Sequence, residues 1–298
     1  MVSKSMCAIF GANKSTMCSA YNRAIAALRV AICELPLCIP RYPTAAEADE
    51  MFEAIQKRHG VAPIDVPNVA VYLDGTNTDI KKSSNEKDQA NNTSGNKGTT
   101  LAHQIVFCTF GWICDIDLNN PGTVNDSRAA IDLFKRFWDP LVNPAQAGML
   151  ADTAYRAYAD ACTVPEAWAR IKAGVYRPLS ATDLPGLPPL YANLILAMSA
   201  WIVSARQADE WGNKALYAAF PRITIARQFV HAHLAREDMQ TVIWLFNLRV
   251  KTVGYNQLAT TYRALVDDRY ARLLACRTVD DYVRLAEQMV SESMDGSL

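Results

Sequence analysis

The spacing of apolar residues changes along this chain, and that change constrains its fold more than any other feature. From residue 10 to 60, apolar side chains recur at three- and four-residue steps, which is typical of helices with one face in a core. Between residues 69 and 118 they form short continuous runs rich in β-branched and aromatic side chains, which is typical of buried strands. Helical spacing dominates again after residue 127. The sequence therefore predicts an α/β fold with a mixed central sheet and helices on its faces.

Two helices are predicted ahead of the sheet. Ser15 is a candidate N-cap for the first helix, whose apolar stripe is expected to face a core. Three prolines between residues 36 and 43 separate it from the second helix. Thr44 and Glu47 form a capping box at the start of that second helix, which is expected to end near Gly60.

The first strands surround a long polar segment. Residues 69–73 form an apolar run that stops at Asp74, and residues 102–110 and 112–118 are predicted to pair as a hairpin. Residues 76–100 are rich in Asn, Ser, Lys and Gly, so we expect a long exposed loop there.

Shorter elements complete the prediction. In chain order they are a turn at 119–122, a helix at 127–138, a strand at 148–151, a helix at 163–173, a loop at 177–190, a long helix at 192–220 and three further helices, the last opened by Thr278 with Asp281. A chain of 298 residues can bury one sizeable core. We expect a helical segment over 1–62, the core over 63–260 with 177–190 as an inserted loop, and a helical extension over 261–298.

Charge and composition narrow the class of protein. Thirty basic residues balance thirty acidic ones, so the net charge gives no general attraction to nucleic acid or to an anionic membrane. Any contact with DNA must then be local. Half of the residues are hydrophobic and a fifth are charged, which is typical of a folded globular protein.

Cysteine usage and hydropathy suggest a compartment. The eight cysteines include no Cys-x-x-Cys pair, and several lie in apolar runs, so we expect reduced, buried thiols in an intracellular protein. The start of the chain has no apolar run of signal-peptide type, and the run from Leu194 to Val203 is well below the ~20 residues of a membrane span.

Three carboxylates have a distinctive placement. Asp74 ends the first predicted strand, Asp126 lies just past the third, and Glu210 lies inside the long helix. On that helix Glu210 shares a polar stripe with Arg206 and Asn213, opposite a thin side of small residues that can approach a sheet. Because Mg²⁺ and Mn²⁺ take oxygen ligands, carboxylates that converge from strand ends and a helix are suited to hold such an ion.

Placement alone leaves ordinary structural roles open for all three residues. An Asp-Gly pair after a strand is most often a turn, which would explain Asp74. Asp126 precedes a helix and could serve as its N-cap. Glu210 could be a solvated residue near Arg206 and Lys214.

A series of short motifs favours the functional interpretation. They are Phe10-Gly-Ala-Asn-Lys-Ser-Thr-Met17, Arg41-Tyr-Pro-Thr44, Tyr72-Leu-Asp-Gly-Thr76, Gly122-Thr-Val-Asn-Asp-Ser127, Ala151-Asp-Thr-Ala-Tyr155, Arg206-Gln-Ala-Asp-Glu-Trp-Gly212 and Phe246-Asn-Leu-Arg249. In this order they resemble the motifs of PIF/Harbinger-type DDE transposases and of related DDE superfamily endonucleases found in fungi. The resemblance runs from about residue 10 to 260.

The resemblance implies an RNase H-like nuclease core and a site. Asp74, Asp126 and Glu210 match the three metal-ligand positions, and Asp152 matches a fourth acidic position beside them. The implied cofactor is Mg²⁺ or Mn²⁺ in a two-metal site that cuts DNA phosphodiester bonds, with possible strand transfer. Arg206 is an auxiliary candidate.

The chain departs from the family pattern at two places. Asn125 stands where the family usually has His, and the segment around Lys97 is less basic than usual. If that His positions substrate or moves a proton, its loss would slow the chemistry. Lys81, Lys82 and Lys97 are candidates for DNA contacts. His231 and His233 would point apart on a helix, so we do not expect them to share a metal.

The resemblance also implies partners and a location. The N-terminal helix alone cannot form a complete helix-turn-helix, so we expect a separate DNA-binding partner protein, besides DNA itself and a possible homo-oligomer. The implied location is the nucleus. The alternative is a catalytically inactive, domesticated protein that acts through protein contacts, and a third possibility is a structure-selective nuclease that does not join ends.

Overall fold

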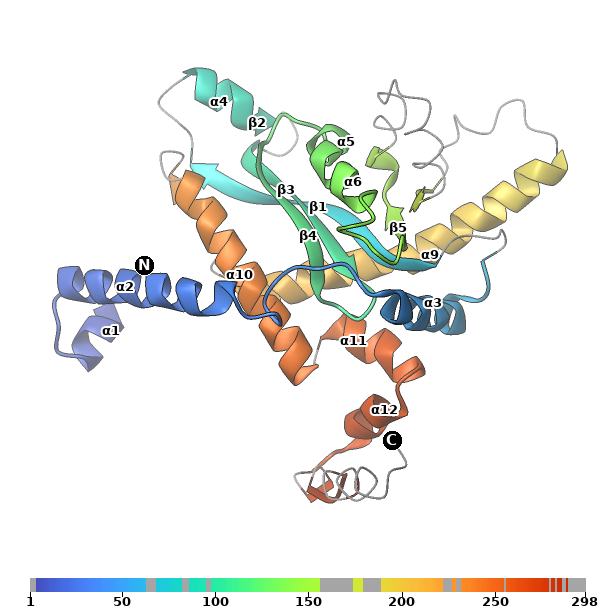
Figure 1. The fold of residues 1–298 in the computed structure, drawn as a ribbon. Helices are drawn as coiled ribbons and strands as arrows, with labels where there is room; N and C mark the ends of the chain where they lie inside the picture. The colour runs from blue at the N-terminus through green and yellow to red at the C-terminus, as the bar shows by residue number, and fades with distance from the viewer. Residues whose placement is uncertain are drawn as a thin grey trace.

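A mixed sheet forms the centre of the protein (Figure 1). The computed structural model describes residues 4–62, 68–81, 86–94, 98–155, 174–178, 189–221, 227–228, 232–254, 256–278, 280–281, 283–285 and 288. The main strands are β1 (Val69–Lys81), β3 (Gly98–Cys108), β4 (Ile113–Pro121), β5 (Gly148–Ala151) and β6 (Val175–Tyr176). They lie in the order β4, β3, β1, β5, β6; the first three are antiparallel, and β5 and β6 run parallel to β1. The predicted mixed α/β architecture is confirmed.

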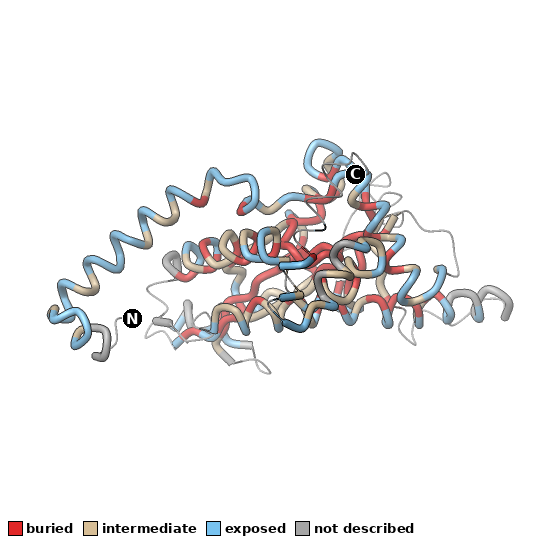
Figure 2. Tube along the Cα trace, turned by 90° about the horizontal axis from the view of Figure 1, so that it is seen from below, coloured by how far each residue is buried: buried red, intermediate tan, exposed pale blue. Residues whose placement is uncertain are grey.

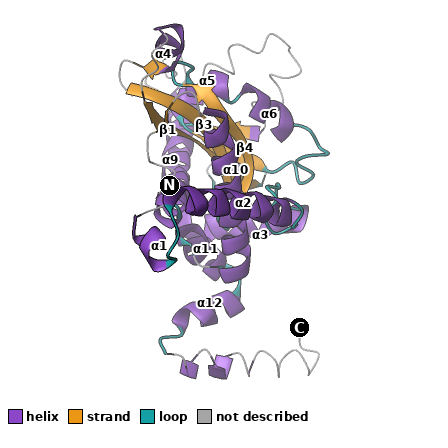
Figure 3. Ribbon diagram, turned by 90° about the vertical axis from the view of Figure 1, so that its left-hand side faces the viewer, coloured by secondary structure: helices purple, strands orange, loops and turns teal. Residues whose placement is uncertain are grey.

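Helices cover both faces of the sheet. The long helix α9 (Pro189–Ala219) crosses one face, and the short helices α5 (Asp126–Ala129) and α6 (Ile131–Phe137) lie on the other (Figures 1 and 3). The first five residues of β1 are fully buried, as a strand covered on both faces requires. Most of the core consists of β-branched, aromatic and small residues from these layers.

The small residues of α9 allow it to approach the sheet closely. Ala205 and Ala208 are fully buried, and a Cβ atom added to Gly212 would lie 2.8 Å from the ring of Phe107 in β3. No side chain larger than hydrogen fits at Gly212 unless Phe107 shifts. The thin side predicted for this helix is confirmed at these three positions.

The polar segment after Asp74 was predicted to be a loop, and this prediction is wrong over most of its length. β1 continues to Lys81 and pairs with β3, and a helix, α4 (Glu86–Asn92), and the two-residue strand β2 (Thr93–Ser94) follow. Polar residues can form these outer parts of β1, β3 and β4 because their side chains hydrogen-bond to one another and to the backbone. His103 is buried, and its ring nitrogens lie 3.0 Å from Oγ1 of Thr78 and 3.1 Å from the donating N–H of Asn119.

The hairpin of β3 and β4 is confirmed, with its tip at Gly111, whose φ is 94°. The turn predicted at 119–122 is corrected, since β4 continues through Pro121. Asn119 instead lies in a bulge of β4 with φ of 67°. The predicted strand at 148–151 is β5. The predicted helix at 163–173 and most of the loop at 177–190 lie outside the described residues.

The N-terminal helices differ in how they meet this body. They are α1 (Lys4–Ile9), α2 (Lys14–Cys33) and α3 (Ala45–His59). The capping box of Thr44 and Glu47 and the end of α3 at Gly60 are confirmed, and α3 contributes to the main core. The N-cap of α2 is Asn13, not Ser15. Only Ile32 of α2 is buried, so the expectation that its apolar stripe faces a core is wrong (Figure 2).

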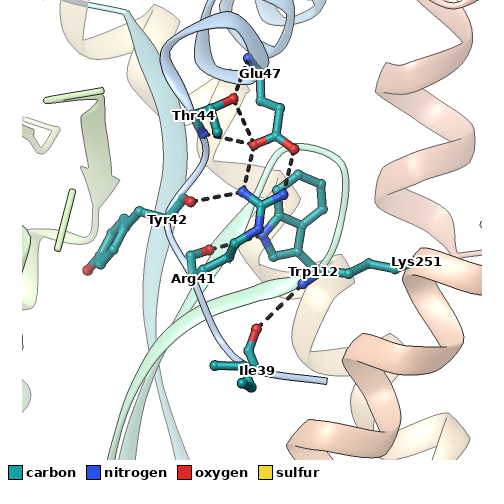
Figure 4. A network of polar contacts seen from close by, with 7 residues as sticks. All are labelled: Ile39, Arg41, Tyr42, Thr44, Glu47, Trp112 and Lys251. Carbon is teal, nitrogen blue, oxygen red and sulfur yellow. Dashed lines mark hydrogen bonds and ion pairs between the residues drawn. The ribbon is translucent and has the colours of Figure 1, made fainter. Parts of the chain in front are cut away.

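A polar network fixes the segment between α2 and α3 to the sheet (Figure 4). The guanidinium of Arg41 donates to both carboxylate oxygens of Glu47 at 2.6 and 2.7 Å and lies over the ring of Trp112. The indole N–H of Trp112 donates to the Arg41 carbonyl, and Lys251 donates to the Ile39 carbonyl. The network joins α3, the tip of the β3–β4 hairpin and α10 (Ala232–Val253).

The remaining described elements are β7 (Arg227–Gln228), which pairs with β1, η1 (Thr153–Tyr155), α11 (Gln257–Tyr262), η5 (Arg263–Leu265) and α12 (Asp268–Ala275). Helical structure after residue 221 is confirmed in α10, α11 and α12, and the last predicted helix, opened by Thr278, begins beyond the end of α12 at Ala275. Thr278 and Asp281 exchange hydrogen bonds as predicted for a helix start.

Candidate active site

Asp74 lies in the middle of β1 and faces α9. Its Oδ2 accepts a hydrogen bond of 2.6 Å from the side-chain amide of Asn213, and its Oδ1 accepts one of 2.9 Å from the backbone N–H of Gly75. Burial raises the pKa of Asp74, and the two hydrogen bonds oppose that shift. The carboxyl group is therefore held in one orientation at a position where its charge is disfavoured.

The parallel pairing of β1 with β5 places Asp152 next to Asp74. Leu73 pairs with Ala151, so Asp74 and Asp152, the residues that follow them, lie side by side where β5 ends, and we call this place the acidic edge. After burial and the hydrogen bonds, the charge of Asp152 also raises the pKa of Asp74. The motif resemblance implies an auxiliary position for Asp152, and the strand register makes it a neighbour of Asp74.

Asp126 reaches the same edge from α5. Its Oδ1 accepts a hydrogen bond of 3.1 Å from the side-chain amide of Gln104, and a Cβ atom added to Gly75 would lie 2.8 Å from that oxygen. Asp126 thus lies directly against the residue that follows Asp74. The N-cap of α5 is Asn125, whose side chain accepts from the N–H of Arg128 at 2.8 Å. The capping role considered for Asp126 belongs to Asn125.

A buried phenol lies among these carboxyl groups. Tyr155 donates a short hydrogen bond to Oε1 of Gln104, the residue that also contacts Asp126. Burial raises the pKa of Tyr155 well above its usual range, and the negative charges of four aspartates add to that shift. The four are Asp126, Asp74, Asp209 and Asp152. Four carboxyl groups from separate elements therefore act on one phenol.

Glu210 lies at the rim of this cluster. Its side chain is 58% exposed, and its carboxylate is 3.7 Å from the ammonium group of Lys214. Among the described residues, no three side chains of His, Cys, Asp or Glu are arranged so that they could share one metal ion. Asp74, Asp126 and Glu210 accordingly do not form a three-ligand metal site with their side chains as they lie.

The helical face that bears Glu210 nevertheless covers the acidic edge. Arg206, Asn213 and Tyr217 lie three, four or seven residues from Glu210 on the same side of α9. Asn213 contacts Asp74, the hydroxyl group of Tyr217 lies 2.6 Å from Oγ1 of Thr76, and a guanidinium nitrogen of Arg206 lies 4.0 Å from Oδ1 of Asp152.

Asp209 was missed by the sequence analysis. It is fully buried, its Oδ2 lies 3.4 Å from Arg206, and no described residue donates to its Oδ1. Burial and the charge of Asp74 raise its pKa well above the usual range. The available signal was its position next to Ala208 and three residues before Gly212, on the side of α9 that faces the sheet.

The chemistry of these donors fits a hard divalent cation. Carboxylate oxygens are the ligands that Mg²⁺ and Mn²⁺ prefer, and a cation would offset the repulsion among these neighbouring carboxyl groups. Oδ1 of Asp209 and Oδ1 of Asn213 are buried without a hydrogen-bond donor in the described part of the chain. Asp74, Asp126 and Asp152 supply carboxylate oxygens of this kind, although their side chains as they lie do not surround one point.

Of the three lysines predicted to contact DNA, the structure describes one. Lys81 is exposed at the end of β1, while Lys82 and Lys97 lie outside the described residues. His231 and the side chain of His233 also lie outside them.

The fold and the site together define a mixed α/β protein with a cluster of carboxyl groups at one edge of its central strand. No helix in the described part of the chain is long and apolar enough to cross a membrane.

Comparison with known proteins gives little further information. No family model matches the chain, and no curated protein matches it. Among solved structures it is similar to a chain of the crystal structure of a pre-cleavage Mos1 transpososome, with 13% sequence identity and a TM-score of 0.24. The match covers 77% of this chain and 64% of that chain, so it spans less than two thirds of the transpososome chain. A TM-score of this size does not establish a common fold.

Proposed function

We propose that this chain is a metal-dependent DNA endonuclease with a DDE-type acidic site on an RNase H-like fold. The observation behind the proposal is the convergence of Asp74, Asp126 and Asp152 on one edge of β1, under the face of α9 that bears Glu210. In this proposal Asp74, Asp126 and Glu210 are the ligands of Mg²⁺ or Mn²⁺ in a two-metal site. Asp152 is an auxiliary acidic residue beside them.

Two further features support the RNase H-like assignment. The strand bearing Asp74 is central, with an antiparallel hairpin on one side and two parallel strands on the other. The acidic residues also lie on the segments that resemble PIF/Harbinger motifs. Membership of that particular group, the nuclear location and the separate DNA-binding partner are part of the proposal and rest on the resemblance alone.

Each residue would have a distinct task in hydrolysis. The bound ions would polarise the phosphate and lower the pKa of an attacking water. The Asn213 amide holds one oxygen of Asp74, which fixes the direction of the carboxylate. Gln104 does the same for Asp126. Arg206 supplies positive charge beside Asp152, which offsets repulsion between a DNA phosphate and the carboxyl groups.

Nicking of supercoiled plasmid tests the proposal. We expect wild-type protein to nick plasmid in Mn²⁺ or Mg²⁺ but not in EDTA, and Asp74→Asn and Glu210→Gln to lower the rate at least about 100-fold. Asp132→Asn is the matched control, because Asp132 is an exposed aspartate that pairs with Lys135 on α6. Absence of nicking by folded wild-type protein at every metal concentration would exclude the nuclease.

The alternative is a catalytically inactive, domesticated protein that serves as a nuclear interaction module. The ion pair between Glu210 and Lys214 favours it, as does the use of Asn125 as a helix cap. This alternative predicts that plasmid stays intact with wild-type protein and with Asp74→Asn or Glu210→Gln. It also predicts that Mn²⁺ changes the melting temperature of wild type and of these variants by the same amount. Joining of cleaved ends, as opposed to cleavage alone, would separate a transposase from a structure-selective nuclease.

A further inference from the structure

Arg206 is bound less tightly than other arginines that face carboxylates in this protein. Arg41 reaches Glu47 at 2.6 and 2.7 Å, and Arg136 reaches Asp115 at 2.9 and 3.0 Å. The nitrogens of Arg206 are 3.4 Å from Asp209 and 4.0 Å from Asp152, and its Nε is buried without a hydrogen-bond acceptor in the described part of the chain. A guanidinium group offers five N–H donors, and the terminal nitrogen near Asp152 has no acceptor within hydrogen-bond distance among the described residues.

Asp209, the carboxyl group that holds Arg206, lies in an unfavourable environment for a charge. Asp209 is fully buried, and Arg206 reaches only one of its two oxygens. Burial of a carboxylate with incomplete hydrogen bonding is unfavourable, and replacing such a pair by neutral groups is often stabilising. The pair of Asp209 and Arg206 therefore contributes little to stability. Its role is better explained by the position in which it holds the guanidinium group.

That place suits an anion. Arg206 is 21% exposed in its side chain and extends from buried Asp209 toward the more exposed Asp152 at the edge of β5. A phosphate approaching Asp74 and Asp152 meets negative charge and needs a local cation, because the net charge of the chain is zero. The planar guanidinium matches two phosphate oxygens.

We propose that Asp209 is a positioning residue that holds Arg206 at the acidic edge, where the guanidinium binds a backbone phosphate of the nucleic-acid strand. The inference rests on the proposed function for the location of the substrate. Asp209 itself does not touch the substrate. It acts by fixing the side chain of Arg206 from the interior.

The test is the salt dependence of DNA affinity, measured by fluorescence anisotropy with a labelled duplex of arbitrary sequence in Ca²⁺. Loss of one phosphate contact lowers the slope of log K against log salt by about 0.9. We expect this change in Arg206→Gln and a large part of it in Asp209→Ala. The double variant should bind no more weakly than Arg206→Gln alone, because the two residues act as one unit. Asp209→Asn should recover part of the affinity, since its amide oxygen can still accept from Arg206.

Controls separate this inference from loss of folding and from the proposed nuclease. Asp132→Asn removes an exposed pair of the same three-residue spacing on α6 and should leave affinity and slope unchanged. Circular dichroism identifies variants that do not fold, and Asp209→Leu, whose apolar side chain cannot accept from Arg206, serves in place of Asp209→Ala if the latter fails. An unchanged slope in Arg206→Gln, or additive losses in the double variant, would overturn the inference. Failure of wild-type nicking would instead count against the nuclease, since the slope is measured without cleavage.

Discussion

At the scale of single residues, two carboxyl groups held by arginines differ in the direction of their pKa shifts. Asp209 is sealed between α9 and the sheet, and its pKa is raised well above the usual range by burial and by Asp74. Glu47 is half-buried, and hydrogen bonds from Arg41 and Thr44 overcome its burial and lower its pKa to about 2. The two groups therefore contribute to stability in opposite pH ranges.

Asp209→Asn should stabilise the protein at neutral pH. Because the folded pKa of Asp209 is raised, its contribution is fully favourable only below the unfolded pKa of about 3.9 and is lost as pH rises through the folded pKa. The neutral amide removes that loss, and we expect a gain on the order of 1 kcal/mol. Urea unfolding at neutral and acidic pH measures it. A gain of equal size at both pH values would contradict the raised pKa of Asp209.

Glu47→Gln should flatten the acid limb of the stability curve. Because the folded pKa of Glu47 is depressed, its contribution is present above the ordinary pKa of 4.5 and is lost as pH falls toward about 2. Solvent screening at this half-exposed pair limits the effect to about 1 kcal/mol or less. Urea unfolding across that acid range checks the prediction, and an unchanged slope in the variant would refute it.

The sequence predicted some site residues and not others for identifiable reasons. Asp74 ends an apolar run and Asp126 opens a helix, and both lie in motifs that resemble those of DDE transposases, so the sequence could select them. Asp209 has no such boundary, and its importance depends on which side of α9 faces the sheet. Periodicity indicated the small-residue side but could not indicate that a carboxyl group would be buried within it.

At the scale of elements, the acidic edge depends on a glycine in strand β1. Gly75 follows Asp74 in β1, and the space that its Cβ would occupy is filled by Oδ1 of Asp126. The close approach of α5 to β1 therefore requires glycine there. This gives the Asp-Gly pair a structural reason that differs from the turn first considered, because β1 continues for six residues past Gly75.

Gly75→Ala should impair the site more than the fold. The added methyl group would lie 2.8 Å from Asp126 and 3.3 Å from the Gln104 amide, so the Asp126 carboxylate must move. We expect plasmid nicking to fall roughly 10- to 100-fold, as displacement by about 1 Å can cause, and stability to fall by no more than about 1 kcal/mol, because the nearest atom is the end of a flexible side chain.

The matched control is the same substitution in an Asp126→Asn background. If displacement of Asp126 is the cause, Gly75→Ala should add little further loss of nicking there. A full additional loss in that background would indicate that the methyl group acts elsewhere.

Elements were predictable where apolar residues formed a pattern. The buried half of β1, the β3–β4 hairpin, β5 and α9 all have such a pattern. The outer halves of β1 and β3 have polar residues, and their pairing depends on contacts such as that of His103 with Thr78, which lie 25 residues apart in the chain. Local polarity predicted a loop there, but pairing between strands that are distant in the chain makes these residues part of the sheet.

At the scale of the whole molecule, one compact core supports both the sheet and the edge that bears the carboxyl groups. The core joins α3, the five main strands, α9, α10 and α11, whereas α2 extends from it and is largely exposed (Figures 1 and 2). The acidic edge lies where β1, β5, α5 and α9 meet. Four separate parts of the chain must fold together before these carboxyl groups come close to one another. Their mutual repulsion therefore raises the free energy of the folded state and not that of the unfolded chain.

The central claim is that this edge binds a divalent cation through Asp74 and Glu210. Crystals grown with Mn²⁺ test it most directly, because anomalous scattering locates the ion. We predict an anomalous peak within coordination distance of the Asp74 carboxylate, with Glu210 turned from Lys214 toward the ion. A structure with Mn²⁺ bound elsewhere, or with no ion at Asp74 and Glu210 still paired with Lys214, would contradict the account.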